Sequence, residues 1–310
     1  NTTGTNNVAM GYQALDANTT ASYNVAIGGT SLTDNSTGAS NVAVGYGSLA
    51  NNTTASSNTA VGRDSLLANT TGTNNVAMGY QALKTNTTGT GNTIVGRMAG
   101  FSNTTASNNT VFGQAALYFN TTGTKNVAVG NNALFWNQTA NNNTAVGDTA
   151  LQANTTGAGN TAVGESALNA NTTASNNTAV GKDALSANTT GTQNTAVGAL
   201  SLDANTTATG NTAFGYNSLT ANTTGDRNVA IGWSAMSVNV DGDRGTALGY
   251  AALQNQEPSS ASDTYNTAVG YAAGNAISTG VRNTAVGGLS LDSLTTENDN
   301  TAIGYAALST

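Results

Sequence analysis

The feature that most constrains the fold of this chain is a short, strict repeat. The string Asn-(Thr/Val)-Ala-(Val/Ile/Met)-Gly recurs with small variations every 17 residues, from Asn7 to Asn300. A single interval, from Gly245 to Asn266, is 21 residues long. Eighteen repeats of 17 residues and four inserted residues account for all 310 positions. This period excludes helix-pair repeats, which need about 33 residues or more. We number each repeat from its first residue, so that Asn7 is position 1.

Each repeat combines a strand pattern with turn-forming residues. Position 3 is Ala except at Ile94 and Val111, position 4 is always apolar, and position 5 is always Gly. The run Thr-Ala-Val is typical of a strand, and Gly and Asn-Thr-Thr-Gly are typical of turns. The sequence therefore predicts an all-β, parallel β-solenoid (β-roll) of 18 coils, with neighbouring strands about 4.8 Å apart. We expect one continuous solenoid over residues 1–310.

The longer interval marks one irregular coil. Its four extra residues fall within 254–265, where Pro258 is the only proline of the chain. Because insertions in repeat proteins lie in loops on one face, we expect a bulging loop around Gln256 to Ser259.

The two apolar positions of the strand point to opposite sides, because side chains alternate along a strand. We expect the small Ala at position 3 to face the coil interior, beside the Leu or Met of position 9. The larger residue at position 4 must then bury against something outside the coil, since monomers rarely expose so long an apolar stripe. The sequence thus predicts that copies associate side by side through this outer apolar row. The valines assigned to the lateral interface are Val44, Val61, Val129, Val146, Val163, Val180 and Val197.

One irregularity supports this assignment of the interior. Gly100 replaces the Leu of position 9, and the two oversized residues of position 3, Ile94 and Val111, lie in that coil and the next. Because protein interiors are closely packed, we expect the larger residues to refill the volume that Gly100 leaves.

Composition excludes several classes of function. The chain has no Cys and no His, which excludes disulfides, thiol catalysis, zinc fingers and His-based acid–base catalysis. A net charge of −7, with few Lys and Arg, argues against nucleic acid and anionic membranes as partners. No apolar run approaches the roughly 20 residues that span a bilayer, so we expect no membrane insertion. The 15 acidic residues show no repeated pairing, and we expect neither an enzyme nor a cofactor.

One segment offers alternate oxygen ligands. Asn239, Asp241 and Asp243 have the spacing of a calcium loop, but the rest of an EF-type loop is missing. A solvated turn is the alternative, and we predict no metal site.

Asparagine forms two rows, at positions 1 and 12. The position-12 Asn belongs to an Asn-X-Thr sequon in most repeats, which leaves two interpretations open. Stacked amides could form a ladder of hydrogen bonds from coil to coil, or the sequons could carry glycans, which would crowd at a spacing of about 4.8 Å. The candidate glycosylation sites are Asn18, Asn52, Asn86, Asn120, Asn154, Asn188 and Asn222.

Aromatic residues mark two candidate surfaces. Position 6 carries eight aromatic residues, from Tyr12 to Tyr305, mixed with charged ones. They could form a ridge that stacks on sugars or protein, or simply cover the coil edge. The densest group is the aromatic cluster, at positions 10 and 11 of adjacent repeats, and it is the candidate contact surface. Its members are Tyr118, Phe119, Phe135 and Trp136.

The NTAVG-type coil, followed by Ala and Leu, resembles the head repeats of trimeric autotransporter adhesins and the repetitive shafts of phage and virus tail fibres. The adhesin heads imply a left-handed parallel β-roll, three chains side by side, and attachment to a host surface. Their apolar strand position, which faces the trimer axis, corresponds to position 4. The repeat here is longer than the common adhesin-head repeat, and no neck, stalk or anchor is present in the sequence.

These observations predict a non-catalytic, structural and adhesive fibre segment on a cell or virion surface, outside the cell. Its expected partners are copies of itself and a glycan or protein receptor. One alternative is the shaft of a phage or virus tail fibre. Another is an ice-binding solenoid, although the adjacent Thr residues of positions 13 and 14 would give only one flat row.

The ends of the sequence suggest axial stacking. The chain begins at position 12 and ends at position 11, with no atypical terminal coil, whereas repeat proteins need polar caps. We therefore expect the coils to continue, or to meet another copy end to end.

Overall fold

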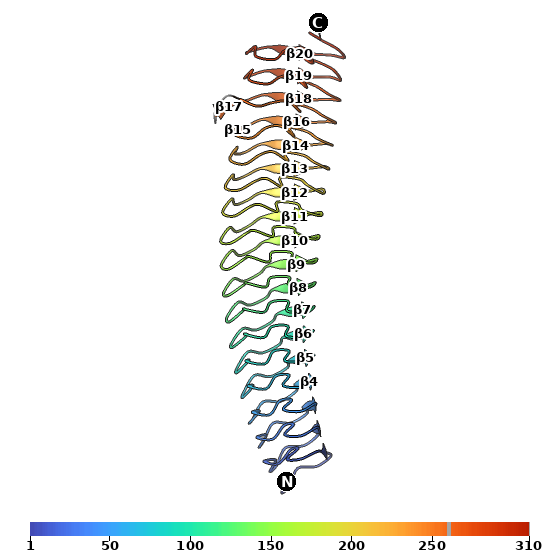
Figure 1. Cartoon of the computed structure of the whole chain (residues 1–310), viewed down its shortest axis with the longest axis vertical. Helices are drawn as coiled ribbons and strands as arrows, with labels where there is room; N and C mark the ends of the chain where they lie inside the picture. Colours follow the sequence, from blue (N-terminus) through green and yellow to red (C-terminus); the bar gives the residue numbers. More distant parts are fainter. Residues whose placement is uncertain (259–261, 310) are drawn as a thin grey trace. The chain divides into compact units, whose positions relative to one another are not determined.

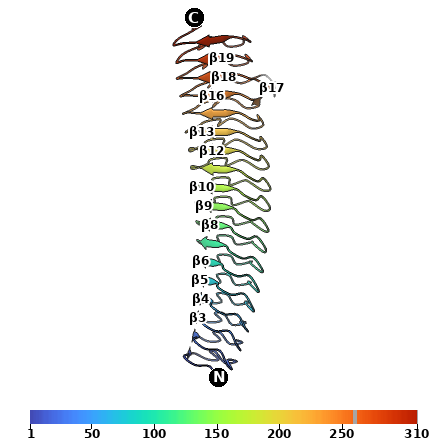
Figure 2. The ribbon, with the colours of Figure 1, turned by 180° about the vertical axis from the view of Figure 1, so that it is seen from behind.

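The computed structural model describes residues 1–258 and 262–309, so Ser259 lies outside the described residues. The chain divides into two compact units, Asn1–Thr156 and Gly157–Thr310. Each unit is a parallel β-solenoid, as predicted, with one three-residue strand in each coil (Figures 1 and 2). That the two form one continuous solenoid stays a prediction.

The first unit contains nine strands of three residues each, paired in parallel and in chain order. Their partners differ by one repeat, so that Ala43 pairs with Ala60. The strands are β1 (Val8–Met10), β2 (Val25–Ile27), β3 (Val42–Val44), β4 (Thr59–Val61), β5 (Val76–Met78), β6 (Thr93–Val95), β7 (Thr110–Phe112), β8 (Val127–Val129) and β9 (Thr144–Val146).

The second unit continues the same pattern and adds a small second sheet. Gly242–Asp243 pairs with Ser262–Asp263 in parallel, at one edge of the coils (Figure 1). The strands are β10 (Thr161–Val163), β11 (Thr178–Val180), β12 (Thr195–Val197), β13 (Thr212–Phe214), β14 (Val229–Ile231), β15 (Gly242–Asp243), β16 (Thr246–Leu248), β17 (Ser262–Asp263), β18 (Thr267–Val269), β19 (Thr284–Val286) and β20 (Thr301–Ile303).

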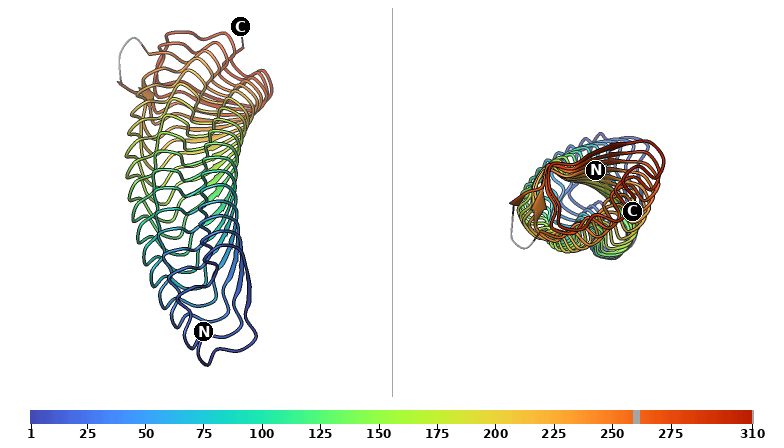
Figure 3. Two further views of the ribbon diagram at one scale, coloured as in Figure 1. Left: turned by 60° about the horizontal axis from the view of Figure 1, so that its bottom comes forward. Right: turned by 90° about the horizontal axis from the view of Figure 1, so that it is seen from above.

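The interior of each coil is filled by small residues and, in most coils, one Leu. Figure 3 shows the backbone rings that enclose it. Ala60 of position 3 and Leu66 of position 9 are completely buried, as are their equivalents in most coils. This confirms the predicted interior. Within each three-residue strand except β1, which is exposed, only the middle residue is buried, since its neighbours at positions 2 and 4 point outward.

The coil closes through backbone conformations that favour glycine. The position-5 Gly has φ between 128° and 149° in every coil, and a Cβ on Gly45 would lie 2.6 Å from the carbonyl oxygen of Gly62. Positions 7, 9 and 17 are also left-handed, and the position-9 Leu residues have φ of 49–56°. This conformation costs a residue other than Gly about 1–2 kcal/mol, whereas burying a Leu contributes about 1.5–3 kcal/mol. Burial therefore offsets the strained backbone of position 9.

Two ladders of buried asparagine connect successive coils. At position 12, Asn52 Nδ2 donates to Asn35 Oδ1 at 2.8 Å and to the carbonyl of Ala55 at 2.9 Å. At position 1, Oδ1 of Asn41 accepts the backbone N–H of Asn58 at 3.0 Å. The ladder interpretation of both rows is thus confirmed, and the amides satisfy polar groups that are buried in the coil.

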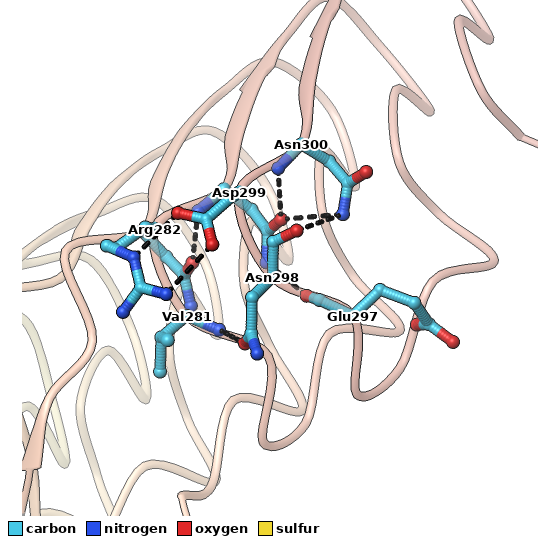
Figure 4. A network of polar contacts seen from close by, with 8 residues as sticks. Val281, Arg282, Glu297, Asn298, Asp299 and Asn300 are labelled. Atoms are coloured by element: carbon cyan, nitrogen blue, oxygen red, sulfur yellow. Dashed lines mark hydrogen bonds and ion pairs between the residues drawn. The ribbon is translucent and has the colours of Figure 1, made fainter.

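Figure 4 shows the same connection between neighbouring coils of the second unit. The backbone N–H and Nδ2 of Asn300 donate to Oδ1 of Asn283 at 3.0 and 3.1 Å. Beside them, Oδ1 of Asn298 accepts the N–H of Val281 at 2.7 Å. Each coil therefore holds the next by both its backbone and its side chains.

Substitutions inside the coil compensate one another in volume. A Cβ on Gly100 would lie 2.9 Å from Ile94 Cδ1, so Ile94 occupies the space of the missing Leu, as predicted. Two further cases were not foreseen. A Cβ on Gly274 would lie 3.0 Å from Ile277 Cδ1, and one on Gly245 would lie 2.1 Å from Met236 Cε. The interior volume of a coil is thus nearly constant.

The irregular coil differs from the expected loop at one point. Gln256 does not bulge outward, because it is completely buried in the position-12 ladder. Its Nε2 donates to Asn239 Oδ1 at 3.3 Å, and its Oε1 accepts from Asn266 Nδ2 at 3.0 Å. Gln256 is long enough to link the two ladders, which sequence spacing alone did not reveal. Pro258 is buried as well, against Gly242.

Candidate interaction surfaces

The outer apolar row is exposed in the single chain. Val163 and Val180 are each 36% exposed, and Phe214 is 55% exposed. The other five valines predicted to form the lateral interface are half-buried and point outward from β3, β4, β8, β9 and β12. The row is therefore where the sequence placed it, on the outside of the coil and without a partner inside its own unit.

The position-6 row, two residues further along, is also exposed but has a mixed composition. In the first unit the Arg63 guanidinium lies 5.9 Å from the Tyr46 ring, and that of Arg97 lies 6.0 Å from the Tyr80 ring. In the second unit Lys182 Nζ lies 3.2 Å from a carboxylate oxygen of Glu165. Charge is thus accepted at position 6, whereas position 4 never carries it.

The aromatic cluster of the first unit forms as predicted. Tyr118 and Phe135 stack at 5.3 Å, Phe119 and Trp136 stack at 4.3 Å, and the two columns meet edge to face. Phe101, which the sequence argument omitted, extends the first column and stacks on Tyr118 at 5.1 Å. Its position, one repeat before Tyr118, was the signal that could have found it.

A second aromatic stack lies in the position-6 row of the second unit. The ring centroids of Tyr216, Trp233, Tyr250 and Tyr271 are separated in turn by 6.3, 4.8 and 5.2 Å. The interplanar angles are 19°, 6° and 11°, so the inner rings are covered on both faces by their neighbours. Such a stack presents ring edges to solvent.

The candidate glycosylation sites are the buried asparagines of the position-12 ladder. Asn120 is completely buried, and its Nδ2 donates to Asn103 Oδ1 at 3.0 Å and to the carbonyl of Gly123 at 2.9 Å. A glycan on this nitrogen would remove a donor and would have no route out of the coil. The other six sites, Asn18, Asn52, Asn86, Asn154, Asn188 and Asn222, are buried in the same way. Their glycosylation stays a prediction, and the folded structure argues against it.

Two residues of the candidate calcium segment, Asn239 and Asp243, are engaged in other contacts. Asn239 is buried in the ladder, and Asp243 Oδ1 accepts the N–H of Asp226 at 2.6 Å. Within residues 1–258 and 262–309, no three Asp or Glu side chains gather as metal ligands would. Among the same residues, no helix is long and apolar enough to cross a bilayer.

The two Thr rows differ in their use. At position 13, Thr53 Oγ1 donates to the carbonyl of Thr70 at 3.2 Å, so these hydroxyls join coil to coil. At position 14, Thr54 and Thr71 point into solvent. A single exposed Thr row remains, as the sequence predicted.

Charged groups of the second unit pair at the surface. Arg282 lies 2.6 Å from Asp299 (Figure 4), and its hydrogen bonds lower the pKa of that carboxyl. Backbone N–H groups of residues 295–297 lower the pKa of Glu297. Burial raises the pKa of Glu257, against a weaker lowering effect of its hydrogen bond from Val240. The contacts of Arg282 with Asp299 and of Glu257 with Val240 each join neighbouring coils.

No known family model matches the chain, and no curated protein matches it significantly.

Proposed function

We propose that the chain is a structural and adhesive segment of an extracellular fibre, without catalytic activity. Copies lie side by side through the outer apolar row, three around a common axis. The single observation that carries this proposal is that position 4 points outward, half-buried or exposed in the single chain, yet is apolar in all 18 coils. An exposed stripe of this length is typical of an interaction surface.

The repeat itself favours a parallel arrangement. Every copy carries the row at the same 17-residue interval, so parallel copies match coil for coil. A closed cyclic arrangement would bury the row of every copy equally, which an open arrangement would not do. The choice of three copies rests on the resemblance to trimeric adhesin heads.

The aromatic cluster would provide the adhesive part, because aromatic side chains dominate the energy of contact surfaces. A tail-fibre shaft of a phage or virus would use the same outer row. The genes that flank the coding sequence would separate these two: secretion genes support the adhesin, and tail genes support the shaft. An ice-binding role would instead rest on the single exposed Thr row, and a thermal-hysteresis assay tests it.

The direct test of assembly is the mass of the native particle in solution, measured by light scattering at several concentrations. Three times the mass of one chain supports the proposal. A monomer that stays soluble at every concentration would contradict it.

A further inference from the structure

The two tryptophans of the chain are equally exposed but differ in which part of the ring solvent can reach. Trp136 and Trp233 are each 45% exposed. Trp233 has a ring on both faces, Tyr216 at 6.3 Å and Tyr250 at 4.8 Å. Its exposure therefore falls on the ring edge.

Trp136 is covered differently. Phe119 covers one face at 4.3 Å and 5°, and Phe135 meets the ring at 5.2 Å and 85°. Its second face is turned toward the next coil. Phe119 thus covers one face of the Trp136 ring, and Phe135 meets the ring edge to face. The second face is therefore the main part of the ring that is open to solvent.

The residue that follows Trp136 in its column is small. The N–H of Phe119 donates to the carbonyl of Phe135 at 3.0 Å, and the N–H of Trp136 donates to that of Gln152 at 3.0 Å, so the same step separates both pairs of coils. Ala153 therefore occupies position 11 of the coil that follows Trp136, just as Trp136 occupies position 11 of the coil that follows Phe119. Because coils are about 4.8 Å apart, Ala leaves a space one ring thick above the indole.

The residues next to Ala153 and Trp136 along the chain include polar, uncharged ones. Gln152 precedes Ala153, and Gln138, an exposed residue, stands at position 13 where the neighbouring coils carry Thr. Amide groups donate and accept hydrogen bonds equally well, which suits hydroxyl groups. An aromatic face attracts the weakly positive C–H groups on one side of a sugar ring, because its π-system is negative.

We infer that the free face of Trp136, above Ala153, is a stacking site for a ring of a neutral carbohydrate. The inference specifies the receptor of the adhesive function proposed above and rests on it. The stacked position-6 row of the second unit is not such a site, because its inner ring faces are already occupied.

The chain allows each tryptophan to be read separately, because it has only two. The Trp233→Phe variant reports on Trp136, and the Trp136→Phe variant reports on Trp233. Fluorescence is titrated with neutral oligosaccharides of glucose, mannose, galactose and N-acetylglucosamine, and with a heparin fragment as an anionic control. We expect a saturable change from Trp136 with at least one neutral sugar and none from Trp233.

The decisive variant is Ala153→Phe, which covers Trp136 as Tyr250 covers Trp233, with Ala153→Ser as its matched control. Ala153→Phe should weaken sugar binding roughly threefold to tenfold or more, and Ala153→Ser should leave it unchanged. The inference is overturned by an absence of saturable change with every neutral sugar, an equal response from Trp233, or undiminished binding by Ala153→Phe. A change that depends on protein concentration alone would assign the face to a protein and also overturn it.

The particle mass is measured in the same samples. If the particle is a trimer but binds none of the sugars, the sugar site is wrong and the lateral interface stands. If it is a monomer that binds sugar, the lateral interface is wrong and the sugar site stands.

Discussion

Two exposed rows run along the coils only two residues apart, and they differ in composition. In three successive repeats, Val146, Val163 and Val180 at position 4 are followed by Asp148, Glu165 and Lys182 at position 6. Val163 and Val180 are each 36% exposed, and the side chains of Glu165 and Lys182 are 56% and 60% exposed. Position 4 is thus partly exposed in the single chain, although less than position 6, and yet it never carries a charge. The difference supports the proposal that another copy of the chain covers the outer apolar row.

The largest expected effect comes from introducing charge at position 4, which position 6 carries naturally. The triple variant Val146→Asp, Val163→Asp, Val180→Asp should dissociate the particle, because an unpaired buried charge costs about 3–5 kcal/mol. Light scattering should report a fall in mass to that of one chain. In the control, Asp148→Asn, Glu165→Gln and Lys182→Gln should leave the mass unchanged. If the triple Asp variant kept the mass of the parent particle, the outer apolar row would not be the interface.

A smaller effect, on stability, is expected from a substitution in the coil interior. Leu151 is completely buried at position 9, and Leu151→Ala should lower the free energy of unfolding by about 2–5 kcal/mol. Asp148→Ala, at an exposed position of the same coil, should change it by less than about 0.5 kcal/mol. Urea unfolding measures both. Equal effects would mean that the interior and the surface are not distinguished as described.

The compensated coil tests whether interior volume is fixed. Ile94→Ala should cost about 2–5 kcal/mol, because it empties the space beside Gly100, and Gly100→Leu alone should cost about 1–3 kcal/mol through overpacking. The double variant should cost clearly less than their sum, since other Leu residues of position 9 adopt the same left-handed backbone. Additive effects in urea unfolding would show that the two sites are independent.

The sequence was sufficient for the fold because the repeat carries the same information eighteen times. The period, the position-5 Gly and the alternation of Ala and Val determined the coil, its interior and its outer row. The cluster around Tyr118 followed from repeat spacing alone. The link through Gln256 and the packing of Met236 against Gly245 did not, because they depend on side-chain length in three dimensions. The left-handed backbone at position 9 was also missed, because Leu is not a residue that signals it.

The smallest expected effect concerns the half-buried carboxyl group of Glu257. Burial raises the pKa of Glu257 above its ordinary value, so the folded state favours the protonated form. Its contribution to stability is therefore greatest below the unfolded pKa of about 4.3 and is lost as pH rises through the raised value. Glu257→Gln should remove this small pH dependence from unfolding curves. A variant with the same slope as the parent above the unfolded pKa would contradict it.

In the proposed assembly, position 4, and not position 6, faces another copy of the chain. Because the chain has no cysteine, Val129→Cys and Asn131→Cys each introduce a single thiol in one coil, at the two rows. In a parallel, in-register bundle the same residue of neighbouring copies meets, and a disulfide needs Cβ atoms only about 3.5–4.5 Å apart. Mild oxidation should therefore link chains of the Val129→Cys variant covalently and leave the Asn131→Cys variant as single chains. Equal linkage of both variants, or linkage at position 6 alone, would contradict the claim.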